Sequence, residues 1–210
     1  MKTMREGNST FSIFNFTFLV ALCCAAAGCF DEPTPAYKTV PAEARVYLKE
    51  MSLADLKGKV DVLKAEVVDY LNLDRNQLTN VNEVASLAGL KWLRLNDNRL
   101  SSLPDLKALA FLRRIYLKNN SFAAVPEQLK DLPSLTDVDL SGNPIKEIPT
   151  WLAEKTGLKN LSFSRTQIKS LPKNLDAWKT LKSLQLGDLN LSAEEMARIR
   201  KALPDVAVVF

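Results

Sequence analysis

The segment from Leu90 to Leu100, LKWLRLNDNRL, contains the pattern that decides the fold. Leu93 and Leu95 alternate with other residue types, as expected for a short strand with one buried face. The alternation then stops, and Asn98 interrupts the apolar pattern before Leu100 completes it. A strand this short, followed by a polar residue between apolar ones, predicts that the chain turns here and returns along another side.

The same pattern occurs six times. Matching segments begin at residues 68, 90, 112, 135, 158 and 181, so neighbouring starts are 22 or 23 residues apart. Each fits L-x-x-L-x-L-x-x-N-x-L closely, and the series resembles leucine-rich repeats over roughly residues 68–203. The resemblance implies an α/β solenoid, an arc or horseshoe whose short parallel strands form a concave sheet. Leucines of one coil are expected to pack against those of the next and to supply most of the stability.

The strand is followed by an asparagine in each of the first four repeats: Asn76, Asn98, Asn120 and Asn143. An amide side chain carries donors and acceptors, so it can pair with backbone groups that lose their partners where the strand ends. Because buried polar groups are normally paired, these asparagines are expected to form a buried ladder. Thr166 and Leu189 replace the asparagine in the last two repeats, which predicts a weaker ladder at the C-terminal end.

Residues 44–67 lack the repeat and are expected to form an N-terminal cap, because a solenoid exposes apolar surface at its ends. Apolar residues in this segment are spaced for helical packing. Ser52 and Asp55 are placed to begin a second helix. The sequence therefore predicts a helical cap at this end.

The C-terminal end predicts a cap made of a helix and a strand. Ser192, followed three residues later by Glu195, fits a capping box with Ser192 as the N-cap. Apolar residues follow at helical spacing as far as Leu203, and Pro204 is expected to end the helix. Residues 204–210 are expected to form a closing strand.

Residues 1–28 are typical of a secretory signal, because Lys2 and Arg5 precede an apolar stretch and a run of small residues. The sequence AAGC, which ends at Cys29, resembles the bacterial lipobox. That resemblance implies cleavage before Cys29, a diacylglycerol on its thiol and an acyl chain such as palmitate on its amine. An ordinary cleaved signal and an uncleaved membrane helix remain the alternatives.

Residues 29–43 contain Pro33, Pro35 and Pro41, which favour an extended, semi-rigid tether. Phe30 follows the expected lipidated cysteine, at a position where aspartate favours retention at the inner membrane of enteric bacteria. The chain therefore resembles lipoproteins of the Gram-negative cell envelope that are sorted to the outer membrane, facing either the periplasm or the cell surface.

Composition excludes several classes of function. The chain has 210 residues and a formal net charge of +4, too small to indicate nucleic-acid binding. It has no histidine, and its three cysteines, Cys23, Cys24 and Cys29, all lie near the N-terminus. The repeats therefore lack the residues for a disulfide framework, a Cys/His metal site or a histidine-based catalytic triad. The sequence predicts no enzyme activity, no cofactor and no metal site.

The candidate binding residues alternate with leucines on the strands, so they are expected to project from the concave face, one row per repeat. The first three rows hold three aromatic and three basic residues, the fourth is acidic, and the last two are mostly small and neutral. The predicted surface comprises Tyr70, Asn72, Asp74, Trp92, Arg94, Asn96, Arg114, Tyr116, Lys118, Asp137 and Asp139.

Tyrosine, tryptophan and arginine dominate binding hot spots, which favours a partner-binding patch on this face. The alternative is that Trp92 packs on Tyr70 and Tyr116 without any partner. The basic residues would meet an acidic protein, an anionic glycan or a lipid headgroup, unless they pair with the acidic row. We therefore expect a membrane-anchored module that binds a protein or glycan, with a structural envelope lipoprotein that has no discrete ligand site as the second hypothesis.

Overall fold

One short strand per coil is the organising element of the fold. The computed structural model describes residues 45–57 and 68–210, within the unit Pro41–Phe210. The predicted signal, the lipid-attachment residue Cys29 and the predicted tether lie outside the described residues.

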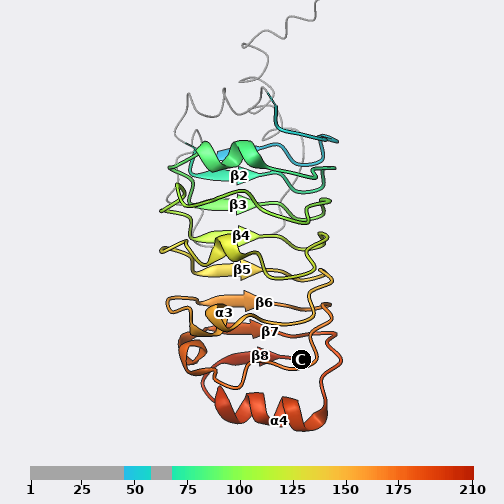
Figure 1. Ribbon diagram of the computed structural model, residues 1–210, viewed down its shortest axis with the longest axis vertical. Coiled ribbons are helices and arrows are strands. Elements are labelled where there is room, and N and C mark those ends of the chain that lie inside the picture. Colours follow the sequence, from blue (N-terminus) through green and yellow to red (C-terminus); the bar gives the residue numbers. More distant parts are fainter. Residues whose placement is uncertain (1–44, 58–67) are drawn as a thin grey trace, which may run out of the picture. The chain divides into compact units, whose positions relative to one another are not determined.

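In the described part of the chain, eight three-residue strands pair in parallel and in chain order to form one sheet (Figure 1). They are β1 (Arg45–Tyr47), β2 (Tyr70–Asn72), β3 (Trp92–Arg94), β4 (Arg114–Tyr116), β5 (Asp137–Asp139), β6 (Asn160–Ser162), β7 (Ser183–Gln185) and β8 (Ala207–Val209). The register is constant, so that Leu93 faces Ile115 and Ile115 faces Val138. Corresponding residues of all coils therefore form straight columns along the sheet.

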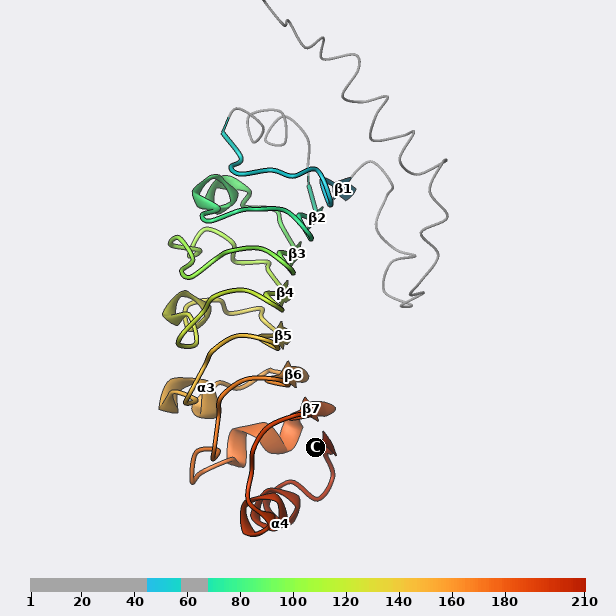
Figure 2. The ribbon, with the colours of Figure 1, turned by 90° about the vertical axis from the view of Figure 1, so that its right-hand side faces the viewer.

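The chain returns from each strand along the other side of its coil, often through a short helical segment. These segments are η3 (Asn82–Ser86), η4 (Glu127–Leu129), α3 (Thr150–Glu154) and η5 (Asp176–Thr180). Figure 2 shows the strands along one side of the stack and the helical segments toward the other. Three of the four are 3-10 helices, which suit a coil with room for only one or two helical turns.

The apolar core lies inside the coils. Leu95 and Leu117, which face inward just after their strands, have 0% exposed surface, as does Leu140 in the next coil. The strand centres Leu93 and Ile115 are also fully buried. Burial of one aliphatic side chain contributes about 1.5–3 kcal/mol relative to exposure, so the repeated leucines are the main source of stability. The predicted leucine-rich repeat solenoid is confirmed.

The predicted asparagine ladder is present, with Asn120 as a representative member. Its Oδ1 accepts a hydrogen bond from the Leu100 amide at 3.0 Å. Its Nδ2 donates to the carbonyl oxygens of Leu95, Leu117 and Lys118 at 2.9, 3.0 and 3.2 Å. Equivalent bonds to neighbouring backbone groups are made by Asn76, Asn98 and Asn143. Each asparagine therefore links its own turn to the coil before it.

The ladder stops in the fifth repeat, as its sequence predicts. Thr166 is buried, with 9% of its surface exposed, and its Oγ1 has no hydrogen-bond partner in the described residues. Leu189, at the same position in the sixth repeat, has no polar side-chain atom to offer. The last two coils are therefore held together without the asparagine linkage.

A residue with positive φ precedes the ladder position in every described coil. These residues, with φ between 53° and 68°, are Glu50, Arg75, Asp97, Asn119, Gly142, Arg165 and Asp188. Only Gly142 is a glycine, so six other residues occupy a left-handed conformation that is unfavourable for L-amino acids with a side chain. The turn out of the strand therefore has the same backbone geometry in each coil, whatever residue occupies it.

The predicted N-terminal helical cap is wrong for the residues that the structure describes. Residues 45–57 contain strand β1 and no helix, and residues 58–67 lie outside the described part. Ser52 has a φ of 53° and does not begin a helix. Asp55 instead accepts a hydrogen bond from the amide of Lys57 at 3.1 Å.

This segment follows the path of an additional coil. Val46 pairs with Leu71 in register, and Val46 and Leu48 alternate as in the repeats, with 4% and 2% of their surface exposed. Met51 occupies the asparagine position, and its amide donates to the Asn76 Oδ1 at 3.1 Å. The alternation of Val46 and Leu48 has the period of a strand, and within residues 45–57 it outweighs the helical spacing of Leu53 and Leu56.

The C-terminal cap has the predicted elements. Helix α4 (Ala193–Ala202) begins at Ser192, whose side chain accepts from the Glu195 amide at 3.2 Å. The helix buries Ile199, and Leu203 follows it with 1% exposed surface. Strand β8 then pairs with β7 as the last strand of the sheet. The N-cap at Ser192 and the closing strand are confirmed.

Candidate partner-binding surface

A line of aromatic rings crosses the N-terminal half of the outer sheet face. The rings of Tyr47 and Tyr70 have centroids 5.2 Å apart, and those of Tyr70 and Trp92 are 5.0 Å apart. Trp92 continues to Tyr116, with centroids at 5.7 Å and planes at 84°. Edge-to-face aromatic pairs contribute about 0.5–1.5 kcal/mol each beyond the area they bury. The straight columns of the sheet place these rings close enough for such contacts.

Two guanidinium groups lie against this line of rings. The Arg114 Cζ lies 4.6 Å from the centroid of Trp92, and the Arg94 Cζ lies 5.8 Å from that of Tyr116. Both distances fall within the range of cation–π attraction. The structure thus brings together five of the predicted residues, Tyr70, Trp92, Arg94, Arg114 and Tyr116, which we call the aromatic–arginine cluster.

Both arginines of the cluster also have carboxylate partners within the same face. The Arg94 Nε lies 2.7 Å from Asp74 Oδ2, and the Arg114 Nε lies 3.8 Å from Asp137 Oδ2. Burial raises the pKa of the Asp74 carboxyl, and the adjacent Arg94 opposes that rise. The positive charge of the cluster is therefore largely balanced by acidic residues beside it.

The side chains of three predicted binding residues accept hydrogen bonds from backbone amides. The side-chain oxygen of Asn72 accepts from the Asp74 amide at 2.9 Å. Asp74 Oδ1 accepts from the Asn96 amide at 2.8 Å, and Asn96 Oδ1 accepts from the Lys118 amide at 2.9 Å. All three side chains are buried, with 5%, 6% and 8% of their surface exposed. These residues form a second polar ladder at the ends of the strands, and Lys118 is its half-buried neighbour.

In the acidic row and the C-terminal half of the face, polar side chains form hydrogen bonds with neighbouring residues of the same half. Asp137 accepts from the Asn160 Nδ2 at 2.5 Å, and Asp139 Oδ1 accepts from the Ser141 amide at 2.9 Å. The hydroxyls of Ser141 and Ser162 lie 2.6 Å apart. The described strands after β4 carry no aromatic ring on this face, so the cluster is confined to one half of the sheet.

Accessibility differs within the cluster. Tyr70 and Trp92 are buried, with 4% and 9% of their surface exposed, whereas Arg94, Arg114 and Tyr116 are half-buried. The three half-buried residues therefore present the accessible atoms of the cluster, and the two buried rings support them.

The sequence prediction missed Tyr47, because it assigned this residue to the N-terminal cap. Val46 and Leu48 stand 25 residues before Leu71 and Leu73, which have the same alternation. That alternation would have placed Tyr47 on the outer face of a further strand.

No group of acidic, histidine or cysteine side chains suited to a metal ion occurs among the residues the structure describes. Within those same residues, no helix has the length and apolarity needed to cross a bilayer.

Comparison with known proteins agrees with the leucine-rich repeat fold. Residues 88–145 match the family model described as "Leucine rich repeat". The crystal structure of an internalin (InlF) from Listeria monocytogenes is similar, with 23% sequence identity and a TM-score of 0.64; the match covers 75% of this chain and 44% of that one. This chain therefore spans less than half of the internalin, and the likeness concerns the fold.

A leucine-rich repeat protein from Leptospira interrogans also matches, with 21% identity and a TM-score of 0.46 over 79% of this chain and 60% of that one. No curated protein matches the sequence significantly. Leucine-rich repeat proteins generally mediate protein–protein interactions and are typically not enzymes.

Proposed function

We propose that this protein is a membrane-anchored recognition module that binds a protein partner through the sheet face, at the aromatic–arginine cluster. The observation that carries the proposal is the continuous line of rings from Tyr47 to Tyr116, with the guanidinium groups of Arg94 and Arg114 against it. Tryptophan, tyrosine and arginine are the residue types enriched among interface hot spots.

The charge balance of the face favours a protein over a polyanion as the partner. Arg94 and Arg114 each have a carboxylate within ion-pair distance, so the cluster offers little net positive charge. Its arginines instead offer planar donors next to aromatic surface, a combination that suits mixed polar and apolar protein surfaces.

The test is capture of the partner by photocrosslinking on intact cells, with the crosslinker placed at Lys118. The main variant is Arg94→Ala with Tyr116→Ala, because both side chains are half-buried. Since Arg94→Ala leaves the buried Asp74 carboxylate without its ion-pair partner, a cooperative thermal transition is required of this variant. Ser162→Ala with Gln185→Ala, on the neutral half of the same face, is the matched control. We expect loss of the crosslinked species in the first variant and its retention in the control.

A second double variant, Trp92→Ala with Tyr116→Ala, removes two adjacent rings of the line and should abolish capture more completely. Since Trp92 is buried, this variant is interpreted only after its thermal unfolding shows a cooperative transition. Unchanged capture in both folded variants would overturn the proposal and favour a structural envelope lipoprotein without a discrete ligand site.

The proposed anchor is a lipid on Cys29 in the outer membrane of a Gram-negative envelope. The lipobox-like AAGC sequence and Phe30 after the cysteine support this proposal. Two or more acyl chains anchor a protein stably, whereas one chain binds only marginally. Labelling of cells with a radioactive fatty acid should mark the protein and should fail for Cys29→Ala, in which Cys23 and Cys24 remain. Label retained in that variant would contradict the assignment.

A further inference from the structure

A second column of residues, at the edge where the strands begin, carries a different kind of charge. It consists of the residue that follows the first apolar position of each repeat: Asp69, Lys91, Arg113, Thr136, Lys159 and Lys182. From Lys91 onward, the amide of each residue donates to the carbonyl oxygen of the residue before it in the column, at 2.7–2.8 Å. The backbone therefore fixes these residues in one straight line, and we call Lys91, Arg113, Lys159 and Lys182 the basic column.

Among the residues that the structure describes, most charges of the basic column have no acidic partner, in contrast to those of the sheet face. Lys91 has a partner, since its Nζ lies 2.9 Å from Asp69 Oδ2. Within residues 45–57 and 68–210, the side chains of Arg113, Lys159 and Lys182 form no ion pair and no hydrogen bond. Arg113 and Lys182 are exposed, and Lys159 is half-buried.

On the side that precedes the strands, the residues beside the basic column are uncharged. The residues two positions earlier in each coil are Gly89, Phe111, Ser134, Gly157 and Thr180. A side chain at Gly89 or Gly157 would meet nothing within 4 Å, so the backbone there is open to an approaching molecule. Phe111 has 61% of its surface exposed, more than any other large apolar residue in the described part of the chain.

We propose that the basic column binds a linear anionic polysaccharide. Neighbouring strands lie about 4.8 Å apart, so the four cations from Lys91 to Lys182 span about 19 Å along a line one residue wide. A chain of sugars that carries carboxylates along its length matches such a line, and Phe111 supplies an apolar surface for a sugar ring. A bilayer of anionic lipids is better matched by a broad cluster of basic residues than by a single file.

This site is separate from the proposed protein-binding cluster and does not depend on it. The cluster lies on the outer face of the strands, whereas the basic column lies at the edge where they begin. Variants of one surface are therefore expected to leave binding at the other unchanged.

The test is a fluorescence-anisotropy titration of a labelled oligogalacturonate, a linear sugar polymer with one carboxylate per residue. Labelled dextran serves as the neutral probe. The protein is the full chain with Cys29→Ala, so that no lipid at that residue contributes. We expect the oligogalacturonate to bind, the affinity to fall as salt is raised, and dextran not to bind.

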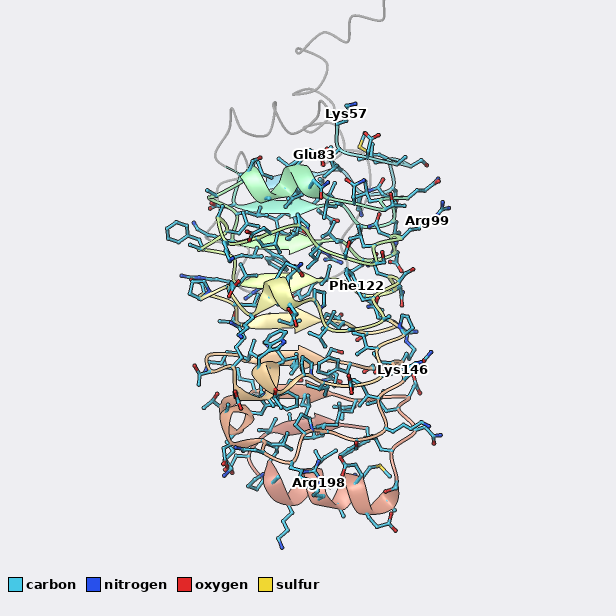
Figure 3. The ribbon with its side chains drawn as sticks, viewed as in Figure 1. Lys57, Glu83, Arg99, Phe122, Lys146 and Arg198 are labelled. Carbon is cyan, nitrogen blue, oxygen red and sulfur yellow. The ribbon has the colours of Figure 1, made fainter. Side chains whose placement is uncertain are left out.

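Arg113→Gln with Lys159→Gln removes two of the four charges, and we expect the affinity for oligogalacturonate to fall about tenfold or more. The matched control is Lys146→Gln with Lys169→Gln, two exposed lysines that remove the same charge from the side toward which the strands run. Figure 3 shows Lys146 on that side of the stack, which is also the side of Arg99. Loss of affinity in this control should not exceed about twofold, because distant exposed charges are screened. Phe111→Ala should weaken binding without changing its salt dependence.

Three results would overturn the proposal. The first is absence of oligogalacturonate binding, and the second is an equal loss of affinity in the control, which would make binding a matter of net charge. The third is binding to phosphatidylglycerol vesicles that depends on Arg113 and Lys159 while the sugar polymer fails to compete, which would assign the column to a membrane surface. Equal thermal midpoints of the Gln variants and the parent exclude unfolding as the cause of any loss.

Discussion

The first coils and the last coils of the solenoid differ in how the backbone groups at the strand ends are hydrogen-bonded. Where a strand ends, buried backbone groups need partners. From Asn76 to Asn143, an asparagine inside each turn supplies them and binds the preceding coil at the same time. At Thr166 the hydroxyl has no partner, and at Leu189 the side chain is apolar.

In the C-terminal coils, helix α4 supplies hydrogen bonds to the backbone where the asparagine ladder is absent. Glu195 Oε1 accepts from the Leu171 amide at 2.7 Å. Arg198, labelled on α4 in Figure 3, donates to the carbonyl oxygens of Leu171 and Pro172 at 3.1 and 3.3 Å. Glu195 and Arg198 also bond to each other, at 2.8 Å, so the pair acts as one unit.

The coils that bond through an asparagine and those that bond to the capping helix therefore occupy different parts of the stack. Each asparagine bonds to its own turn and to the preceding coil, so the ladder does not need a coil after it. At the C-terminal end, helix α4 covers the last coils and bonds to backbone groups of the fifth repeat. Three kinds of substitution test this comparison: removal of an asparagine from the ladder, removal of a bond from the capping helix, and addition of an asparagine at the ladder position of the fifth repeat.

The largest effect is expected for Asn120→Ala. The substitution leaves the buried Leu100 amide without a partner, whereas the carbonyl oxygens of Leu95, Leu117 and Lys118 each lose one of two donors. An unsatisfied buried group costs about 1–3 kcal/mol and each of the other lost bonds costs less, so the free energy of unfolding should fall by about 2–3 kcal/mol. Urea denaturation followed by circular dichroism measures the change.

Thr166→Ala is the control for this prediction, because it removes a hydroxyl that bonds to nothing in the described residues. Its cost should be limited to a small cavity, about 1 kcal/mol or less. Equal midpoints for the two variants would mean that the asparagine ladder does not stabilise the stack.

Glu195→Ala should have the next largest effect. It frees the Leu171 amide and leaves Arg198 without its carboxylate. Loss of these bonds should cost about 1–2 kcal/mol, and the C-terminal coils should show faster amide hydrogen exchange than the asparagine-linked coils. Glu194→Ala, an exposed glutamate on the same helix, is the matched control; a uniform increase in exchange along the whole stack would contradict local docking.

The same contact predicts a pH dependence at the C-terminal end. The hydrogen bond from Arg198 lowers the pKa of Glu195 below its usual value of 4.5. A carboxyl whose pKa is lower in the folded state stabilises the fold fully above the unfolded value, and that contribution is lost as pH falls through the folded pKa. Stability should therefore decline in acid below about pH 4.5, and Glu195→Gln should flatten part of that decline. An unaltered acid profile in this variant would contradict the assignment.

Extension of the ladder should give a smaller effect of opposite sign. Thr166→Asn places an amide where the repeat pattern already provides the turn, since Arg165 has the same positive φ as Arg75 before Asn76. The new side chain should bond to the backbone of the fourth and fifth repeats and raise the free energy of unfolding by about 1 kcal/mol. Thr166→Val, which cannot make these bonds, serves as the control; a gain in both variants would point to packing instead.

The repeat period made most of the fold predictable from the sequence. Residues such as Leu95 and Leu117 are buried because every coil imposes the same inward position, and six matches fix that position. The role of Asn120 followed from the need to pair a buried amide. The first coil was missed because Met51 replaces the asparagine and because apolar spacing around Leu53 fits a helix as well as a coil.

The surface was less predictable, because the same residue types serve structure and binding. Asn72 and Asn96 are polar and lie on the outer face, yet both bond to the backbone. Nothing in their local sequence distinguishes them from free side chains. The contact between Glu195 and Leu171 joins residues 24 positions apart, and only the packing of α4 on the preceding coil brings them together.

The smallest effect is expected at the turn before the ladder position, where Arg165 has a φ of 56°. Arg165→Gly relieves the left-handed strain of about 1 kcal/mol, but glycine loses more backbone entropy on folding, so a net gain of about 0.5 kcal/mol remains. Lys169→Gly, at an exposed position without positive φ, should destabilise by a similar amount and serves as the control. Differential scanning calorimetry measures both changes. A loss of stability in Arg165→Gly would show that the arginine side chain stabilises this turn by more than its backbone strain costs.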